Sequence, residues 1–384
     1  MPKETAAFFS LLRPGLWGDG NPDIRIVGTT DWYEVYQLAA EQSVLGLVLA
    51  GLEHSDVKPP QVLLLQWIGE VQVIEQQNKA MNEFVALLIE KLREVDIYAL
   101  LVKGQGVAQC YERPLWRTSG DVDLLLSKDN YEKAKVFLIP YASEVETEYE
   151  REKAIGLTIR DTFGTSDQGR ADEWSVELHG HLYVGLSSRV ERELDMVLQD
   201  TFSGGQVRTW MNGTTQVYLL KAENDVFYVF AHILQHFYKG GIGLRQICDW
   251  CRLLYCYRVE LDLRILELRI KRAGLMSEWK AFGAFAVEYL GMPIEAMPFL
   301  NDNLNANLKK KADRICEFIL EVGNFGHNRD MSYYDKYPYL VRKAISAWWR
   351  AKDLCRHAMI FPLDSLKFSF AIMVNGLRSA VRGE

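Results

Sequence analysis

Apolar residues recur at three- and four-residue steps through the first part of the chain, which is the spacing of an amphipathic helix. Residues 61–95 predict one or two long helices, whose apolar stripe contains Leu64, Ile68, Val71, Ile74, Met81, Phe84, Leu87 and Leu88. Pro59-Pro60 ends any helix that precedes these residues, because proline disfavours helix at the residue before it. We therefore expect residues 5–98 to be helical.

The middle of the chain changes to short apolar or alternating segments, which are typical of strands. We expect strands at residues 98–102, 121–126, 155–160 and 173–179, helices at 105–111 and 130–138, and a polar, glycine-containing stretch at 164–172. Residues 207–211 and 215–219 flank Asn212-Gly213, a pair that favours a tight β-hairpin. These segments predict a small mixed α/β unit.

Helical spacing returns at residue 222. Its first stripe contains Val226, Phe230, Ile233, Leu234 and Phe237, and further helices are expected near 261–274, 277–290, 304–321, 338–355 and 364–380. We predict an α+β fold, with a small mixed-sheet core at residues 97–220 between an N-terminal helical region at 1–96 and a C-terminal helical domain at 221–384. No repeat or long linker separates them, so they are expected to pack into one body.

Composition narrows the class of protein. The chain has 384 residues, 48% of them hydrophobic and 25% charged, which suits a globular protein. A net charge of -7 gives no general basic field, so a nucleic-acid partner is neither indicated nor excluded. The N-terminus lacks a secretory leader, and the longest apolar stretches are shorter than the ~20 residues that span a bilayer. We expect a cytoplasmic protein without a membrane partner.

The six cysteines do not have the spacing of a disulfide framework. Cys248, Cys251 and Cys256 could hold zinc or act as small buried hydrophobes. The helical pattern of residues 246–254 favours the second interpretation.

Two carboxylates stand out in the predicted strand at 121–126. Asp121 and Asp123 share one face of that strand, while Val122 and Leu124 point to the other. Like charges side by side raise each other's pKa and resist burial, and a divalent cation resolves this conflict. Mg²⁺, or Mn²⁺ in its place, takes one or two protein carboxylates and fills its coordination with water and phosphates.

Two neighbouring segments add to this candidate metal site. Lys103-Gly104 ends the first strand, where a glycine allows close backbone approach and a lysine can meet a phosphate. In the strand at 173–179, alternation places Ser175, Glu177, His179 and His181 on one face. Glu177 is thus a candidate third carboxylate, which can bind metal or take a proton from an attacking hydroxyl.

Lys103-Gly104, a helix, and then Arg117-x-Ser119-x-Asp121-x-Asp123 together resemble the minimal nucleotidyltransferase module of the DNA polymerase beta superfamily. The resemblance is strongest to its uncharacterised bacterial nucleotidyltransferase-like family and the related abortive-infection toxin nucleotidyltransferases. It covers residues 97–182 and extends to the first C-terminal helices at 232–249.

The resemblance implies roles for individual residues. Asp121 and Asp123 would hold Mg²⁺ bound to a nucleoside triphosphate, and Glu177 would be the third carboxylate and the base toward the acceptor. Lys103, with Ser119 or Arg117, would steady the triphosphate.

The chain departs from the superfamily at the phosphate-binding turn. Many members have Gly-Ser or Gly-Gly there, whereas this chain has Gly104-Gln105-Gly106. Gln105 can donate a hydrogen bond and Gly106 can let the backbone come close, so the turn remains a candidate nucleotide site.

We therefore predict transfer of a nucleoside monophosphate from an NTP to a hydroxyl-type acceptor, which could be a small molecule, a tRNA or a protein. Gln105 favours an alternative, a non-catalytic nucleotide-binding or regulatory protein on the same fold. A third interpretation is a metal-dependent hydrolase that uses Glu177, His179 and His181. The sequence leaves the acceptor, the preferred base and the oligomeric state open.

Other polar residues have a functional and a structural interpretation. His179, His181, Lys239 and Arg245 are candidate substrate contacts, although Arg245 could instead pair with Asp249 one helical turn later. We interpret a histidine of the pair His232 and His236 as a packed core residue, the loop at 323–330 as an ordinary connection, and the aromatic and basic residues near 348–356 as an amphipathic helix.

Overall fold

The computed structural model describes residues 2–28, 30–146, 153–160, 173–301, 304–324 and 338–368. The predicted polar stretch at 164–172, most of the loop at 323–330 and most of the predicted helix at 364–380 lie outside these residues. Among the described residues, no helix is both long enough and apolar enough to cross a membrane.

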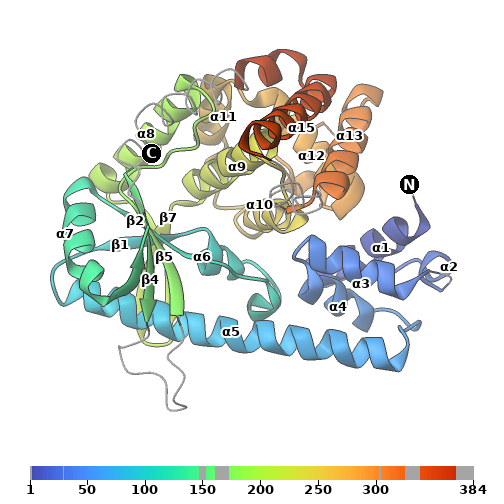
Figure 1. Cartoon of the computed structure of the whole chain (residues 1–384), viewed down its shortest axis with the longest axis horizontal. Coiled ribbons are helices and arrows are strands. Elements are labelled where there is room, and N and C mark those ends of the chain that lie inside the picture. The colour runs from blue at the N-terminus through green and yellow to red at the C-terminus, as the bar shows by residue number, and fades with distance from the viewer. Residues whose placement is uncertain are drawn as a thin grey trace.

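The N-terminal region is helical, as predicted. It contains α1 (Lys3–Trp17), α2 (Ile24–Val27), α3 (Trp32–Glu41), α4 (Leu45–Glu53) and α5 (Gln61–Arg93). The predicted long run is one helix, α5, which begins directly after Pro60 and extends from the first four helices to the sheet (Figure 1).

Helices α1 and α4 approach each other through glycine. A Cβ built on Gly15 would lie 1.7 Å from the Leu47 carbonyl oxygen, and one built on Gly51 would lie 1.8 Å from the Leu11 carbonyl oxygen. Only residues without a side chain allow this backbone contact.

The middle of the chain forms a seven-stranded mixed sheet in the order β3-β4-β5-β2-β1-β7-β6. The strands are β1 (Ala99–Val102), β2 (Val122–Leu126), β3 (Ala142–Val145), β4 (Ala154–Arg160), β5 (Glu173–His179), β6 (Val207–Asn212) and β7 (Thr215–Leu220). β2 is parallel to β5 and β1 is parallel to β7, whereas the other neighbours are antiparallel. The predicted α+β fold with a mixed sheet is confirmed.

The remaining helices lie between the strands in the chain or follow the last strand. They are α6 (Gly104–Ala108), α7 (Lys128–Leu138), α8 (Ser188–Gly204), α9 (Ala222–Lys239), α10 (Leu244–Cys256), α11 (Leu263–Ala273), α12 (Met276–Leu290), α13 (Ala306–Val322) and α15 (Tyr339–Ile360). Short 3₁₀ turns occupy Pro114–Trp116, Ile139–Tyr141 and Ile294–Ala296. The strand β3 and the helix α8 were not predicted.

Two hydrophobic cores lie on opposite faces of the sheet. Leu124 and Leu126 of β2 pack with Phe84 and Leu88 of α5 in one core. Leu125 packs in the other with residues of α9 and α10. Because side chains alternate along a strand, Asp123 shares the face of Leu125. The predicted acidic face therefore points toward the C-terminal helices.

The cysteines of α10 agree in part with the prediction that they are small buried hydrophobic residues. Cys248 and Cys251 are fully buried as small apolar side chains, whereas Cys256 at the end of the helix is exposed.

Candidate active site

The three predicted carboxylates lie on, or directly before, two neighbouring strands. Asp123 of β2 is paired in register with Glu177 of β5, and Asp121 directly precedes β2. Paired positions of adjacent strands project from the same face of a sheet. Asp121 is hydrogen-bonded to the Ser175 hydroxyl, which belongs to the same face of β5.

His179 completes a compact cluster with two of these acids. Its Nε2 lies 2.8 Å from Asp123 Oδ1 and 3.3 Å from Glu177 Oε2. One ligand atom from each of Asp123, Glu177 and His179 can be chosen so that all lie within 4.8 Å of one another. Burial acts to lower the pKa of His179, but its hydrogen bonds to Asp123 and Glu177 outweigh this and raise it.

Lys103 reaches the same carboxylate from the end of β1. Its Nζ lies 2.6 Å from Asp123 Oδ1, and its backbone has φ 57° and ψ -148°. This region is rarely occupied by residues with a side chain and costs ~1–3 kcal/mol. Gly104, at φ 41°, continues the turn. A strained turn therefore directs the Lys103 amine at Asp123.

The electrostatics of the cluster fit a divalent cation. Burial acts to raise the pKa of Asp123, but Lys103 and His179 outweigh it and hold that pKa well below its usual range. The pKa of Asp121 is raised by burial and then by the charges of Glu177 and Asp123. The repulsion among three carboxylates is what an ion with oxygen ligands relieves, so Asp121, Asp123 and Glu177 suit Mg²⁺ or Mn²⁺.

A cavity of about 260 Å³ opens over these acids, between the sheet and helices α9 and α10. Its lining includes Lys103, Asp121, Asp123, Glu177, His232, His236, Arg245 and Asp249. A second cavity, of about 210 Å³, includes Lys103, Glu177, His179, His181, Tyr228 and His232 in its lining. The two cavities therefore meet at Lys103, Glu177 and His232.

The model of a family described as uncharacterised nucleotidyltransferases matches residues 28–291, which include the whole sheet, α9 and α10. The chain belongs to this family. A crystal structure of an antigenic nucleotidyltransferase-like protein from Paracoccidioides brasiliensis is similar over 56% of this chain and 93% of its own chain, at 16% identity and a TM-score of 0.34. A search of curated proteins found no match.

Arg117 of this nucleotidyltransferase-family chain is held by α10. Its Nε and Nη2 each donate to the Asp249 carboxylate at 2.7 Å, and Tyr111 donates its hydroxyl to Asp249 at 2.8 Å. The Arg117 Nη1 also lies 3.4 Å from the Ser119 hydroxyl. Arg117 thus fixes the segment that leads to the acids, and its predicted contact with a triphosphate stays a prediction.

The turn residues after Lys103 differ in their roles. The Gln105 side chain is buried and donates to Asn78 Oδ1 of α5 at 2.9 Å, so the cavity over the acids does not include it. A Cβ on Gly106 would lie 2.8 Å from Leu219 Cδ2, so this glycine allows α6 to approach β7. Gly104 is the residue of the Gly104-Gln105-Gly106 turn that lines the cavity.

The structure separates the candidate substrate contacts. His179 and His181 line the second cavity, where His181 Nε2 lies 2.6 Å from Asp195 Oδ1. Arg245 lines the cavity over the acids, and its Nη1 donates to the Thr118 carbonyl at 2.8 Å. Lys239 is in the lining of neither cavity, and its amine lies beside Gly185.

Sequence reasoning missed a part of the cavity wall. His232 and His236, one turn apart on α9, line the cavity with their Nε2 atoms 3.1 Å apart. Burial lowers the pKa of both, to about 4 for His236, so the pair is uncharged at neutral pH. Their spacing was visible in the sequence, but the interpretation as packed core residues did not reveal that this face of α9 lies over the acids.

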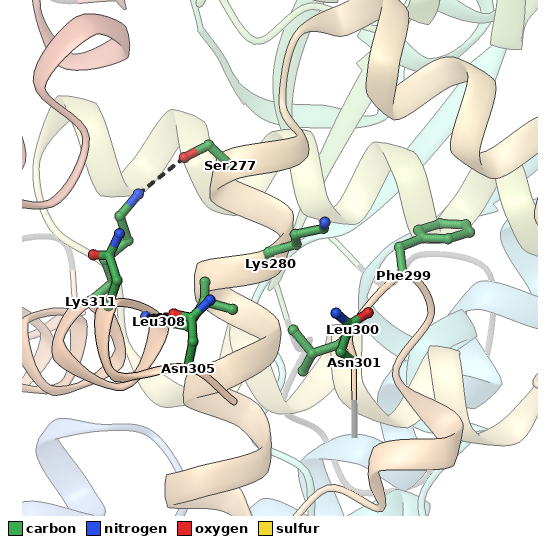
Figure 2. Close-up of a pocket in the computed structure, with 9 residues that line it drawn as sticks. Ser277, Lys280, Phe299, Leu300, Asn301, Asn305, Leu308 and Lys311 are labelled. Carbon is green, nitrogen blue, oxygen red and sulfur yellow. Dashed lines mark hydrogen bonds between the residues drawn. The ribbon is translucent and has the colours of Figure 1, made fainter. Parts of the chain in front are cut away.

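A third cavity, of about 240 Å³, lies away from this site between α12 and the start of α13 (Figure 2). Lys280 and Lys311 line it together with Phe299, and Lys311 donates to the Ser277 hydroxyl at 3.1 Å. No residue of the acidic cluster belongs to its lining.

Proposed function

We propose that this protein transfers a nucleoside monophosphate from an NTP to a hydroxyl-type acceptor with the help of Mg²⁺ or Mn²⁺. The acceptor oxygen forms a bond to the α-phosphorus, the bond between the α- and β-phosphates breaks, and pyrophosphate leaves. The observation that carries the proposal is the register of β2 and β5, which brings Asp123 and Glu177 side by side with Asp121, under a cavity that Lys103 also lines.

Each residue has a role that follows from its contacts. Asp121, Asp123 and Glu177 would hold the metal, which neutralises negative charge on the phosphates when it is bound. His179 donates to Asp123 and keeps that carboxylate in position. Lys103 remains a cation, because the charge of Asp123 raises its pKa against the effect of burial. It supplies positive charge beside the reacting phosphate.

The two cavities supply places for two substrates. The NTP binds in the cavity over the acids, and the acceptor enters from the second cavity. Glu177 belongs to both linings, and its side chain is 41% exposed, so it can accept the proton of the attacking hydroxyl. A small acceptor suits a cavity of about 210 Å³ better than a long nucleic acid does.

The alternative, a non-catalytic nucleotide-binding or regulatory protein, is favoured by Gln105, which is turned toward Asn78 rather than into the cavity. The two proposals differ in whether a covalent product forms.

Calorimetry with Mg²⁺ and each of the four NTPs tests nucleotide binding first. The wild type is expected to bind at least one NTP, and the isosteric Asp121→Asn/Asp123→Asn variant is expected to lose most of that affinity. Unchanged binding by the variant, or none by the wild type, contradicts the proposal.

An NTP labelled at its α-phosphate, incubated with the protein and cell extract, then tests transfer. Label in a protein, RNA or small-molecule fraction supports the enzyme and identifies the class of acceptor. Binding without transfer supports the non-catalytic alternative. A tightly bound transition metal in elemental analysis would instead support the hydrolase that uses Glu177, His179 and His181.

A further inference from the structure

Three permanent cations line the cavity over the acids, and two of them have carboxylate partners. Lys103 is paired with Asp123 at 2.6 Å, and Arg117 is paired with Asp249 at 2.7 Å. Arg245 makes no direct ion pair in the part of the chain that the structure describes, although the charges of Asp249 and Asp121 act on it from farther away.

Arg245 nevertheless lies in a largely buried position on the first turn of α10. Its Nη1 donates to the Thr118 carbonyl, and its buried Nε has no hydrogen-bond partner among the described residues. Burial, followed by the charge of Arg117, lowers its pKa, and the charges of Asp249 and Asp121 offset this only in part. Buried charges in proteins are normally paired, so an unpaired guanidinium that lines a cavity is a place for an anion.

The turn that follows Lys103 does not itself supply a side chain that could bind phosphate in the cavity. Gln105, in the turn after Lys103, donates to Asn78 and does not line the cavity, so its side chain offers no donor to a ligand there. A guanidinium has five N–H donors in a planar fork that matches phosphate oxygens. After the bond from Nη1 to Thr118, donors of Arg245 remain for a ligand.

We propose that Arg245 binds the terminal phosphates of the nucleotide and makes the cavity select triphosphates over monophosphates. This inference rests on the proposed function for the identity of the nucleotide, but the anion site itself can be measured without it. Inorganic tripolyphosphate carries the same terminal phosphates and no base.

The test compares the wild type with Arg245→Gln and Arg245→Lys by calorimetry in Mg²⁺. The titrants are tripolyphosphate, the four NTPs and the matching NMPs. Lys280→Gln is the matched control, because it removes one positive charge from the separate cavity of Figure 2.

Arg245→Gln is expected to weaken binding of tripolyphosphate and NTP by about tenfold or more, as loss of a charge-assisted hydrogen bond predicts, with NMP binding within about twofold. Arg245→Lys keeps the charge without the planar fork, so its loss should be smaller. Lys280→Gln should bind all titrants as the wild type does.

Unchanged tripolyphosphate and NTP affinity in Arg245→Gln overturns the inference. An equal loss of NMP affinity also overturns it, since Arg245 then acts on the whole cavity. If Arg245→Gln does not fold, Arg245→Lys decides, because wild-type affinities in that variant show that the fork is not used.

Failure of the inference can be told apart from failure of the proposed function. If tripolyphosphate binding depends on Arg245 but no nucleotidyl transfer occurs, the anion site is supported and the proposed enzymatic function is contradicted. If the wild type transfers nucleotide and Arg245→Gln has the same KM for NTP as the wild type, the enzymatic function is supported and the anion site at Arg245 is contradicted.

Discussion

Glu278 is a fully buried carboxyl group far from the acidic cluster in sequence. It accepts a hydrogen bond from the Tyr238 hydroxyl at 3.3 Å, and its Oε2 has no partner among the described residues. Burial, followed by the charge of Asp364, raises the pKa of Glu278 to about 8. The group is therefore protonated in the folded protein at neutral pH.

This shift predicts that stability falls as pH rises. Between the ordinary pKa of 4.5 and the folded value of about 8, the folded protein holds a proton that the unfolded chain releases. The contribution is fully present below pH 4.5 and is lost at up to ~1.4 kcal/mol per pH unit as pH rises through this window.

Urea unfolding of the wild type and Glu278→Gln at pH 5, 6.5 and 8 measures the effect. The neutral glutamine mimics the protonated acid, so the variant should match the wild type most closely at pH 5 and exceed it at pH 8. A difference in stability that is the same at all three values of pH would contradict the assigned protonation.

Single residues also show what the sequence could and could not predict about the site. Alternation within each strand predicted that Asp121 and Asp123 share one face, and that Ser175, Glu177 and His179 share one face of theirs, because strand periodicity is local. The pairing of the two strands, which brings Asp123 beside Glu177, is not local. The Gln105 side chain is oriented by its hydrogen bond to Asn78 on α5, and the Arg117 side chain by its ion pair with Asp249 on α10. Such partners are distant in sequence, and no local pattern encodes them.

At the scale of elements, the crossing of α1 and α4 depends on two glycines. Gly51→Ala would place a Cβ 1.8 Å from the Leu11 carbonyl oxygen, a backbone atom that can move only with its helix. We expect this substitution to destabilise the protein by ~1–3 kcal/mol or more, as overpacking does.

Gly69→Ala is the matched control within α5. A Cβ there meets nothing within 4 Å, so the same change should stabilise the protein by ~0.5–1 kcal/mol through helix propensity. Thermal unfolding of both variants checks the pair. Equal effects of the two substitutions would mean that the α1 and α4 contact is looser than the structure shows.

Elements differed in how far the sequence predicted them. Long periodic segments such as α5, and the hairpin around Asn212-Gly213, were predicted correctly because their signals are local. The strand β3 has four residues, none of them buried, so it carries no alternation and depends on pairing with β4. The helix α8 did carry a signal, since Val190, Leu194, Val197 and Thr201 are buried at helical spacing.

At the scale of the whole molecule, the site forms where the sheet meets the C-terminal helices. The Arg117 and Asp249 pair joins these parts across 132 positions of sequence, with side chains 5% and 10% exposed. Asn78 of α5 adds bonds to the carbonyls of Leu115 and Arg117, at 2.8 Å each. The segment before the acids is thus held from two sides.

The buried pair predicts strong energetic coupling. Arg117→Met removes the ion-pair partner of the buried Asp249, and Asp249→Leu removes that of the buried Arg117, so each should cost ~3–5 kcal/mol. The double variant leaves neither charge behind and should cost much less than the sum. Urea unfolding of the four proteins gives the coupling energy, which should exceed ~2 kcal/mol.

The exposed pair of Arg160 and Glu173, at 2.9 Å with side chains 60% and 47% exposed, provides the reference cycle. Solvent screens such a pair, so its coupling should stay below ~1 kcal/mol. If the Arg117 and Asp249 cycle gives a value that small, the pair does not join the sheet to α10. If the coupling is large, the pair holds the segment that precedes Asp121 against α10.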